Sequence, residues 1–160
     1  MMKTRKALFA LIGAVLIVFA GESFYRSRHL KEPVVAGPGV TMVRKLSESF
    51  QGIKGSINDA NVYVLEGKKP GGSVLLLGGS HPEEPAGRLA TWVMTENAVV
   101  EQGRVFILNS ANRSATTVTR LGGAYPADFS ITTGWGERTF RMGERWTNPL
   151  DQWPDPKIRG

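Results

Sequence analysis

Hydrophobic positions divide the chain into an apolar amino-terminal run and a later region of short strand and helix patterns. The run from Ala7 to Ala20, ALFALIGAVLIVFA, contains no polar side chain. Because a core helix usually carries a polar stripe, this run predicts an apolar helix outside the core. Lys3, Arg5 and Lys6 precede it, an order typical of a secretory signal. The run is shorter than the ~20 residues that span a bilayer, but a longer segment through Tyr25 would make an uncleaved anchor.

Two strand patterns follow after residue 60. Asn61–Glu66, NVYVLE, is rich in β-branched and aromatic residues. Ser73–Leu77, SVLLL, is continuously apolar, as expected for a central strand buried on both faces. The glycine-rich turn between them allows the two strands to form a hairpin.

A helix pattern and a third strand come next. Pro85 is tolerated as the first residue of a helix, so the helix is predicted to begin at Glu84 or Pro85 and to end near Asn97. Arg104–Asn109, RVFILN, is another buried strand, whereas residues 121–160 show no regular pattern. Strand, helix and strand in this order predict an α/β domain with helices packed on a sheet. One face of the helix is apolar and carries Ala86, Leu89, Ala90, Val93 and Met94.

These patterns predict three parts. Residues 1–25 form a signal peptide or membrane anchor, so that membrane contact is expected through residues 7–25. Residues 26–59, which contain prolines and glycines between charged residues, form a linker and lead-in. Residues 60–160 form the folded domain, delivered outside the cytoplasm or held at the membrane.

The strongly basic composition does not predict nucleic-acid binding. Residues 1–31 hold six of the 20 Lys and Arg residues but one of the 14 Asp and Glu residues. The rest of the chain is therefore nearly neutral and lacks the basic stripe that binds phosphates. The chain also contains no cysteine, which excludes disulfides, thiolate metal sites and a cysteine nucleophile.

The candidate chemistry lies where the second strand ends and the helix begins, in the sequence GGSHPEEPAG of residues 78–87. Ligands of open α/β sheets bind at the carboxyl ends of strands. His81 and Glu84 are three residues apart across a turn bounded by prolines, so an imidazole and a carboxylate can converge on one point. A catalytic zinc ion takes such ligands, together with a third protein ligand and an open position for water. A surface histidine beside solvated acids is the alternative.

This stretch resembles the first zinc motif of the succinylglutamate desuccinylase/aspartoacylase family, which is related to the zinc carboxypeptidases. In that motif a strand leads into a glycine-rich turn, His, two residues, Glu and then Pro-x-Gly. By position, His81 and Glu84 would be the first two zinc ligands. Pro82 departs from the glycine common in the family, which restricts the loop without removing a ligand. The resemblance implies a three-layer α/β fold, a mixed sheet with flanking helices, of which this chain holds the incomplete amino-terminal part.

A second resemblance follows the third strand. Residues 109–115, NSANRSA, are similar to the segment in which the family places an Asn and an Arg that hold a substrate carboxylate. By position, Asn112 and either Arg120 or Arg113 would bind substrate, with Arg120 preferred. A guanidinium group binds a carboxylate through two parallel hydrogen bonds. Solvated loop arginines are the alternative.

The resemblance implies a zinc-dependent hydrolase of amide bonds in small N-acyl amino acids or peptides. The family's third histidine ligand is not matched, since the other histidine of the chain, His29, lies upstream. The family's glutamate base is not matched either. We therefore expect that this chain lacks the full active site. The alternative from another class is a non-catalytic exported or membrane-anchored binding module of the same fold.

The amino-terminal pattern yields a test of location. Residues 1–35 fused to a reporter that is active only after export are expected to deliver the reporter outside the cytoplasm, because a basic start followed by an apolar run directs export. A reporter that stays soluble in the cytoplasm contradicts this prediction.

Overall fold

The computed structural model describes residues 2–29, 33–118, 128–134 and 136–151. The chain divides into two units, Met1–Glu32 and Pro33–Gly160. The first unit holds the predicted apolar helix, α1 (Met2–His29), which continues through Gly21 without a break. Its stretch Thr4–Arg26 has a mean hydropathy of 2.2 and is, within the described residues, the one helix long and apolar enough to be a signal or a membrane anchor.

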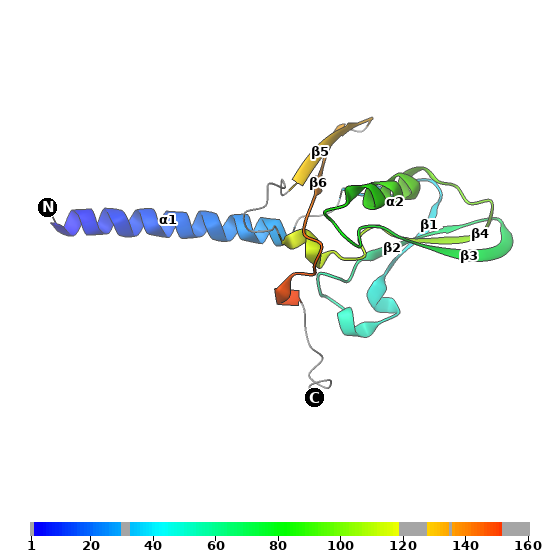
Figure 1. The fold of residues 1–160 in the computed structure, drawn as a ribbon, viewed down its shortest axis with the longest axis horizontal. Helices are drawn as coiled ribbons and strands as arrows, with labels where there is room; N and C mark the ends of the chain where they lie inside the picture. The colour runs from blue at the N-terminus through cyan, green and yellow to red at the C-terminus, as the bar shows by residue number, and fades with distance from the viewer. Residues whose placement is uncertain (1, 30–32, 119–127, 135, 152–160) are drawn as a thin grey trace. The chain divides into compact units, whose positions relative to one another are not determined.

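The second unit is built on a four-stranded sheet (Figure 1). Its strands are β1 (Val40–Lys45), β2 (Asn61–Glu66), β3 (Lys69–Leu77) and β4 (Gln102–Leu108), in the order β1-β2-β4-β3. β2 is antiparallel to β1 and to β4, whereas β3 is parallel to β4. The fold is therefore mixed α/β, as predicted, and β1 extends the sheet into the predicted lead-in. Short 3-10 turns, η1 (Leu46–Glu48) and η2 (Gln51–Ile53), connect β1 to β2.

The first two strand patterns do not form the hairpin that the turn between them would allow. β4 lies between β2 and β3, and both strands pair with it rather than with each other. Val105–Leu108 of β4 is apolar on both faces, with Ile107 and Leu108 buried. Such a strand gains most from the position between two neighbours, where the side chains of both adjacent strands help to remove its own side chains from water.

The prediction that Ser73–Leu77 is a buried central strand is also wrong. β3 lies at the edge of the sheet, and Leu75 and Leu77 are 61% and 55% exposed. A continuous apolar run predicts burial on both faces but does not specify the strand order. In β3 only Leu76 packs against the central cluster of Tyr63, Leu65 and Ile107.

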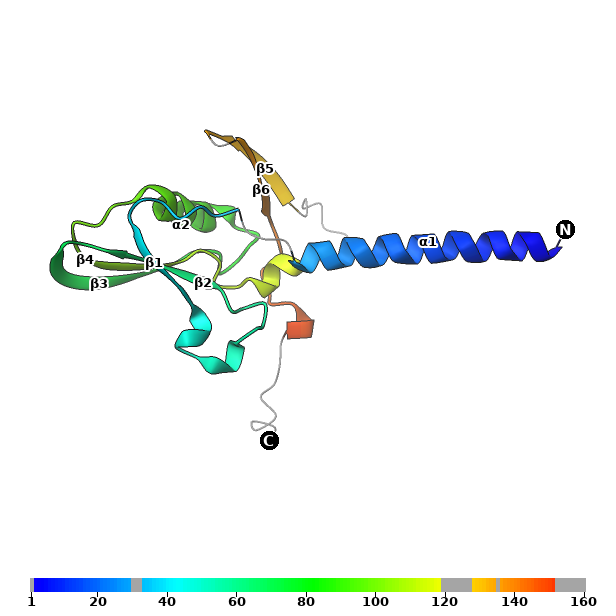
Figure 2. The same cartoon turned by 180° about the vertical axis from the view of Figure 1, so that it is seen from behind.

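One helix, α2 (Pro85–Asn97), lies along one side of the sheet (Figure 1, Figure 2). Its bounds agree with the prediction, including Pro85 as the first helical residue. Its apolar face is largely exposed, with Val93 at 60% and Met94 at 40%. The buried residues are instead Arg88, Thr91, Trp92, Thr95 and Glu96.

Hydrogen bonds allow this polar face to be buried. The Thr91 hydroxyl donates to the Arg88 carbonyl oxygen over 2.9 Å. The Thr95 hydroxyl lies 2.9 Å from the Thr91 carbonyl oxygen and 3.2 Å from Oδ1 of Asn109, at the end of β4. A buried polar group costs little when it is hydrogen-bonded, so α2 packs on the sheet through hydroxyl groups as well as apolar contacts.

A second, two-stranded sheet was not predicted. β5 (Asp128–Thr133) and β6 (Gly136–Arg141) form an antiparallel hairpin. Because the tip of this hairpin is rich in glycine, the sequence shows no regular strand pattern there. Gly136 has a positive φ of 102°, which favours glycine in such a turn. Phe140 is buried and its ring lies 4.3 Å from the ring of Trp92, which attaches the hairpin to α2.

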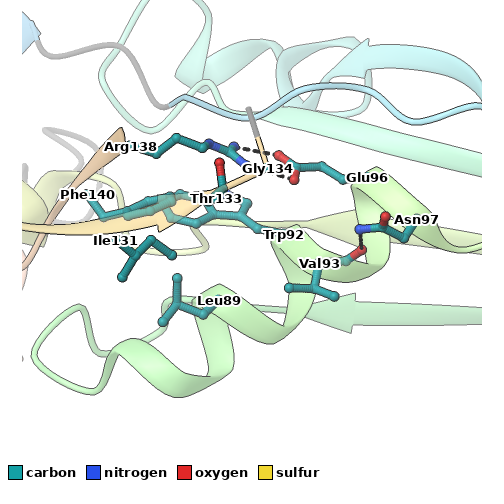
Figure 3. A pocket seen from close by; sticks show the side chains of 10 residues that line it. All are labelled: Leu89, Trp92, Val93, Glu96, Asn97, Ile131, Thr133, Gly134, Arg138 and Phe140. Atoms are coloured by element: carbon teal, nitrogen blue, oxygen red, sulfur yellow. Dashed lines mark hydrogen bonds and ion pairs between the residues drawn. The ribbon is translucent and has the colours of Figure 1, made fainter. Parts of the chain in front are cut away.

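Beside these rings, a buried ion pair joins the hairpin to α2 (Figure 3). Arg138 of β6 donates to both carboxylate oxygens of Glu96, and also to the backbone carbonyl of Pro33. The backbone N–H of Val35 donates to the same carboxylate over 3.1 Å. A pocket of about 300 Å³ opens next to the pair, with apolar walls that include Leu89 and Ile131.

The ion pair makes stability depend on pH. Burial opposes ionisation of Glu96, but the Arg138 hydrogen bonds, the Val35 N–H and the Arg138 charge outweigh it and lower its pKa from the ordinary 4.5. A lowered pKa in the folded state adds stability above pH 4.5 that is lost as the pH falls through the lower value. We expect Glu96→Gln to remove this acid-sensitive part and to destabilise the fold at pH 7 by about 3–5 kcal/mol, since it leaves Arg138 buried without its charge partner.

Urea unfolding of both proteins between pH 3 and pH 7 measures this effect. Glu137→Gln, an exposed change on the same strand β6, is the control and is expected to be neutral. An unchanged unfolding midpoint for Glu96→Gln at pH 7 contradicts the prediction.

Candidate metal centre

Two loops meet at the carboxyl ends of the parallel strands β3 and β4. The N–H of Gly78 donates to the Leu108 carbonyl oxygen over 2.8 Å, which extends the pairing by one residue. The N–H groups of Ala111 and Asn112 then donate to the carbonyl oxygens of Gly78 and Gly79, over 2.8 and 3.1 Å. The loop that carries His81 therefore runs directly beside the loop that carries Asn112. The sequence predicted both loops, and the structure brings their backbones together.

The two glycines allow α2 to approach this strand end closely. A Cβ atom on Gly78 would lie 2.2 Å from Oγ1 of Thr91 and 3.0 Å from the Asn109 carbonyl oxygen. Gly79 has a φ of +61°, a conformation that L side chains rarely adopt, and its Cβ position lies 3.1 Å from Cδ of Arg88. Both glycines are therefore required by the packing of the helix against the turn.

A tight turn then presents the candidate ligands. The N–H of Glu84 donates to the His81 carbonyl oxygen over 2.9 Å, which closes a four-residue β-turn. Pro82 occupies the second position of this turn, which proline favours, and its ring is fully buried. The residue that departs from the family pattern thus suits the turn, and Pro85 starts α2 immediately afterwards.

His81 and Glu84 face each other across the turn. Nδ1 of His81 lies 3.7 Å from Oε1 of Glu84, and their side chains are 39% and 66% exposed. Two ligands at 2.0–2.2 Å from one tetrahedral zinc ion would lie roughly 3.3 Å apart, so a small side-chain rotation brings both into range. Glu84 makes no capping hydrogen bond at the start of α2, so its carboxylate is not engaged by the helix amino terminus. The pair fits two positions of a zinc site.

A third protein ligand is not provided by the residues that the structure describes. Among them, no group of three or more His, Cys, Asp or Glu side chains could hold a metal ion together. His29, the other histidine of the chain, belongs to α1 in the first unit, where its Nδ1 lies 2.8 Å from the Tyr25 carbonyl oxygen. Site geometry therefore rests on His81 and Glu84.

The predicted substrate-binding residues are placed in part. Asn112 lies beside Gly79, but its Oδ1 accepts hydrogen bonds from the Ala115 N–H and the Thr147 hydroxyl, each over 3.2 Å. Its carbonyl group thus supports the loop. Arg113 is the next residue and is half-buried at the start of η3 (Ser114–Thr117). Arg120, the preferred carboxylate ligand, lies outside the described residues.

A support beneath the turn was not predicted from the sequence. Arg88 is 1% exposed, and its guanidinium carbon lies 4.9 Å from the centre of the Trp92 ring. Its aliphatic part packs under Gly79, so Arg88 positions the turn rather than facing solvent. An arginine within a helix pattern gives no sign of this role, because arginine is usually exposed.

A second support holds the loop after β4. Ser114 is fully buried, donates to the Asp151 carboxylate and accepts from the backbone N–H of Asn148 over 3.0 Å. The Asn148 side chain donates to the Thr117 hydroxyl over 2.9 Å. These bonds attach the segment of residues 147–151 to η3, next to Asn112. The common residue types involved gave no signal in the sequence.

Comparison of the chain with protein-family models, with curated proteins and with solved structures found no match. The functional interpretation therefore depends on the motif and on the geometry of its turn.

The close approach at the glycine turn yields a prediction about stability. Gly78→Ala is expected to destabilise the second unit by about 1–3 kcal/mol, because the new methyl group collides with buried Thr91. Gly87→Ala is the matched control: nothing lies within 4 Å of its Cβ position inside α2, and alanine should stabilise the helix by up to about 1 kcal/mol. Thermal unfolding followed by circular dichroism measures both. Equal effects of the two substitutions would show that Gly78 has room for a side chain.

Proposed function

We propose that this chain is the amino-terminal part of a zinc-dependent hydrolase that cleaves amide bonds in small N-acyl amino acids or peptides. The observation that carries the proposal is the position of His81 and Glu84. They face each other over 3.7 Å in a turn fixed by buried Pro82, at the carboxyl end of a parallel strand pair. This is where α/β sheets bind ligands, and these are ligand types that catalytic zinc uses.

In this proposal the residues of the chain have distinct roles. His81 and Glu84 hold the metal, which when bound would supply an activated water molecule and polarise the amide carbonyl group. Gly78 and Gly79 allow α2 to fix the turn, and Arg88 supports it from below. Arg113 or Arg120 binds the substrate carboxylate. We also propose that α1 exports the second unit or anchors it to a membrane.

The proposal includes a limit on this chain alone. A catalytic zinc site of this type uses three protein ligands and a general base, and no histidine follows His81 in the sequence. A longer form of the protein would have to supply the missing groups. The 160-residue chain is therefore proposed to bind zinc weakly and not to turn over substrate.

Zinc binding tests the ligand assignment. The chain is expected to bind zinc more weakly than a three-ligand site, His81→Ala should abolish this binding, and Glu84→Gln should weaken it at least tenfold, since each removes one of two ligands. His29→Ala is the control and should have no effect. Titration against a chromogenic zinc indicator gives the affinities. Zinc uptake that is indifferent to His81 would refute the assignment.

Hydrolysis tests the reaction. Release of free amine from N-acyl amino acids, including N-acetylaspartate and N-succinylglutamate, is measured for this chain and for a form extended through any downstream reading frame. Only the extended form is expected to be active, and its activity should require zinc and His81. Turnover by the short chain would show that its site is complete, and an inactive extended form with zinc bound would contradict the hydrolase proposal.

A further inference from the structure

The apolar helix α1 exposes hydrophobic side chains on every side. Val15, Leu16, Ile17, Val18 and Phe19 follow one another, and each is between 45% and 73% exposed. Because successive residues of an α-helix point about 100° apart, five residues in a row face every direction around the axis. The apolar window within Thr4–Arg26 is 0% buried in the part of the chain that the structure describes. A helix that is apolar all round requires an apolar surrounding, which a lipid bilayer provides.

The length of α1 matches a bilayer only when its last turns are included. At a rise of about 1.5 Å per residue, the uninterrupted apolar run of residues 7–20 covers about 21 Å. The stretch from Leu8 to Tyr25 covers about 27 Å, close to the ~30 Å hydrocarbon thickness of a typical bilayer. The residues after Ala20 are helical in the structure, as this longer span requires.

Side-chain contacts stabilise these last turns. Nε and Nη2 of Arg26 donate to Oε1 of Glu22 over 3.0 and 2.8 Å. An acid four residues before a base is the favourable order for such a pair on a helix. The ring of His29 stacks on the ring of Tyr25 with 4.1 Å between their centres, and Nδ1 of His29 lies 2.8 Å from the Tyr25 carbonyl oxygen. This contact satisfies one of the carbonyl groups that the end of a helix leaves without a partner.

The same residues suit the surface of a membrane. Tyr25 is 62% exposed, and aromatic side chains with a polar end concentrate where lipid meets water. Glu22 lies nearer to the apolar run and is paired with Arg26, which lowers the cost of placing its carboxylate there. At the other end of α1, the basic residues among positions 3–6 favour a cytoplasmic amino terminus.

Two positions along α1 have the small residues that a signal peptidase recognises. Val18 and Ala20 precede one bond, and Gly21 and Ser23 precede the other. Both bonds lie inside the continuous helix, where backbone groups are hydrogen-bonded within α1. A peptidase that pairs with an extended segment needs those groups free, so the helix would first have to open. The ion pair described above also spans the second bond.

We propose that α1 is an uncleaved anchor whose partner is a lipid bilayer, crossed from Leu8 to Tyr25 with the second unit outside. The anchor role rests on the export part of the proposed function and replaces its alternative, a signal that is removed. It is independent of zinc. The candidate site of His81 and Glu84 then acts at a membrane surface, and its substrates have to reach that surface.

Fractionation of cells that express the full chain tests the anchor. Intact mass should show that residues 1–23 are retained. The chain should stay in membranes washed with alkaline carbonate, because a helix that crosses the bilayer is inserted almost irreversibly.

Single cysteines report the crossing, because the chain has no cysteine of its own. The reagent is a maleimide that cannot pass the membrane. Met42→Cys, at a half-exposed position of β1, should react in intact spheroplasts. Ala14→Cys should react only after the membrane is dissolved and the chain is denatured, since residue 14 lies in the hydrocarbon.

Two substitutions of Glu22 test whether the continuous helix protects α1 from cleavage. Both remove the ion pair, but only Glu22→Pro also removes a helix N–H and clashes with the Val18 carbonyl group, which opens the helix at Ala20. Glu22→Pro should raise the fraction cleaved after Ala20 and released at least tenfold, whereas Glu22→Ala should stay intact and anchored. Adding Ala20→Arg to Glu22→Pro should block this cleavage, because the site requires a small residue.

Several results would overturn the proposal. A native chain that begins at Gly21 or Phe24 would show that α1 is a cleaved signal. Release of the intact chain by carbonate would show that α1 lies on the membrane rather than across it. Equal retention of Glu22→Pro and Glu22→Ala would show that helix continuity does not protect the bond.

These failures are distinguishable from failure of the proposed function. An exported but cleaved chain would contradict the anchor and leave export and the zinc site intact. Met42→Cys that reacts only after lysis would refute export itself. His81→Ala should leave every fraction unchanged, so loss of zinc binding does not bear on the anchor.

Discussion

The carboxylate of Glu96 accepts hydrogen bonds from Arg138 on the hairpin and from Val35 in the lead-in, and Arg138 also bonds the carbonyl oxygen of Pro33. Three segments far apart in the sequence thus meet at one buried ion pair. The buried apolar cluster of the main sheet is small, with Tyr63, Leu65 and Ile107 at its centre. A desolvated charge is costly without its partner, so the lead-in, α2 and the hairpin are stable in this arrangement only together.

The turn at the candidate site depends on that arrangement through α2. The ion pair and the contact of Trp92 with Phe140 hold the helix to the hairpin, and Thr91 and Arg88 hold it against Gly78 and Gly79. His81 and Glu84 lie between the fixed strand end and the fixed helix start. Their geometry is thus set by packing at some distance from these two side chains.

The sequence predicted elements whose signals are local. Asn61–Glu66 agrees with β2 at both ends, and the bounds of α2 follow from the rule that proline is tolerated in the first helical turn. It did not predict the position of β3. The apolar content of a strand does not reveal that a later strand, here β4, will pair between it and β2 and leave it at the edge. The sequence also failed for the buried face of α2, where hydrogen bonds of Thr91 and Thr95 outweigh the apolar periodicity.

The same distinction holds at the candidate site. The Gly-Gly-Ser-His spacing identified the location of the turn, since glycine and proline act on their own backbone. Arg88 has its role through its contacts with Gly79 and with Trp92, and Ser114 through its hydrogen bond to Asp151. No local sequence pattern encodes these contacts. The use of Asn112 Oδ1 as a loop acceptor is likewise determined by Thr147, 35 residues away.

The polar buried face of α2 also has a thermal consequence. Unfolding exposes its hydroxyl and guanidinium groups where a leucine-lined helix would expose hydrocarbon. Newly hydrated apolar surface raises the heat capacity, whereas polar surface lowers it. The heat-capacity increment of this domain is therefore expected to be smaller than its length implies, and its free energy of unfolding is expected to change more gently between cold and warm conditions.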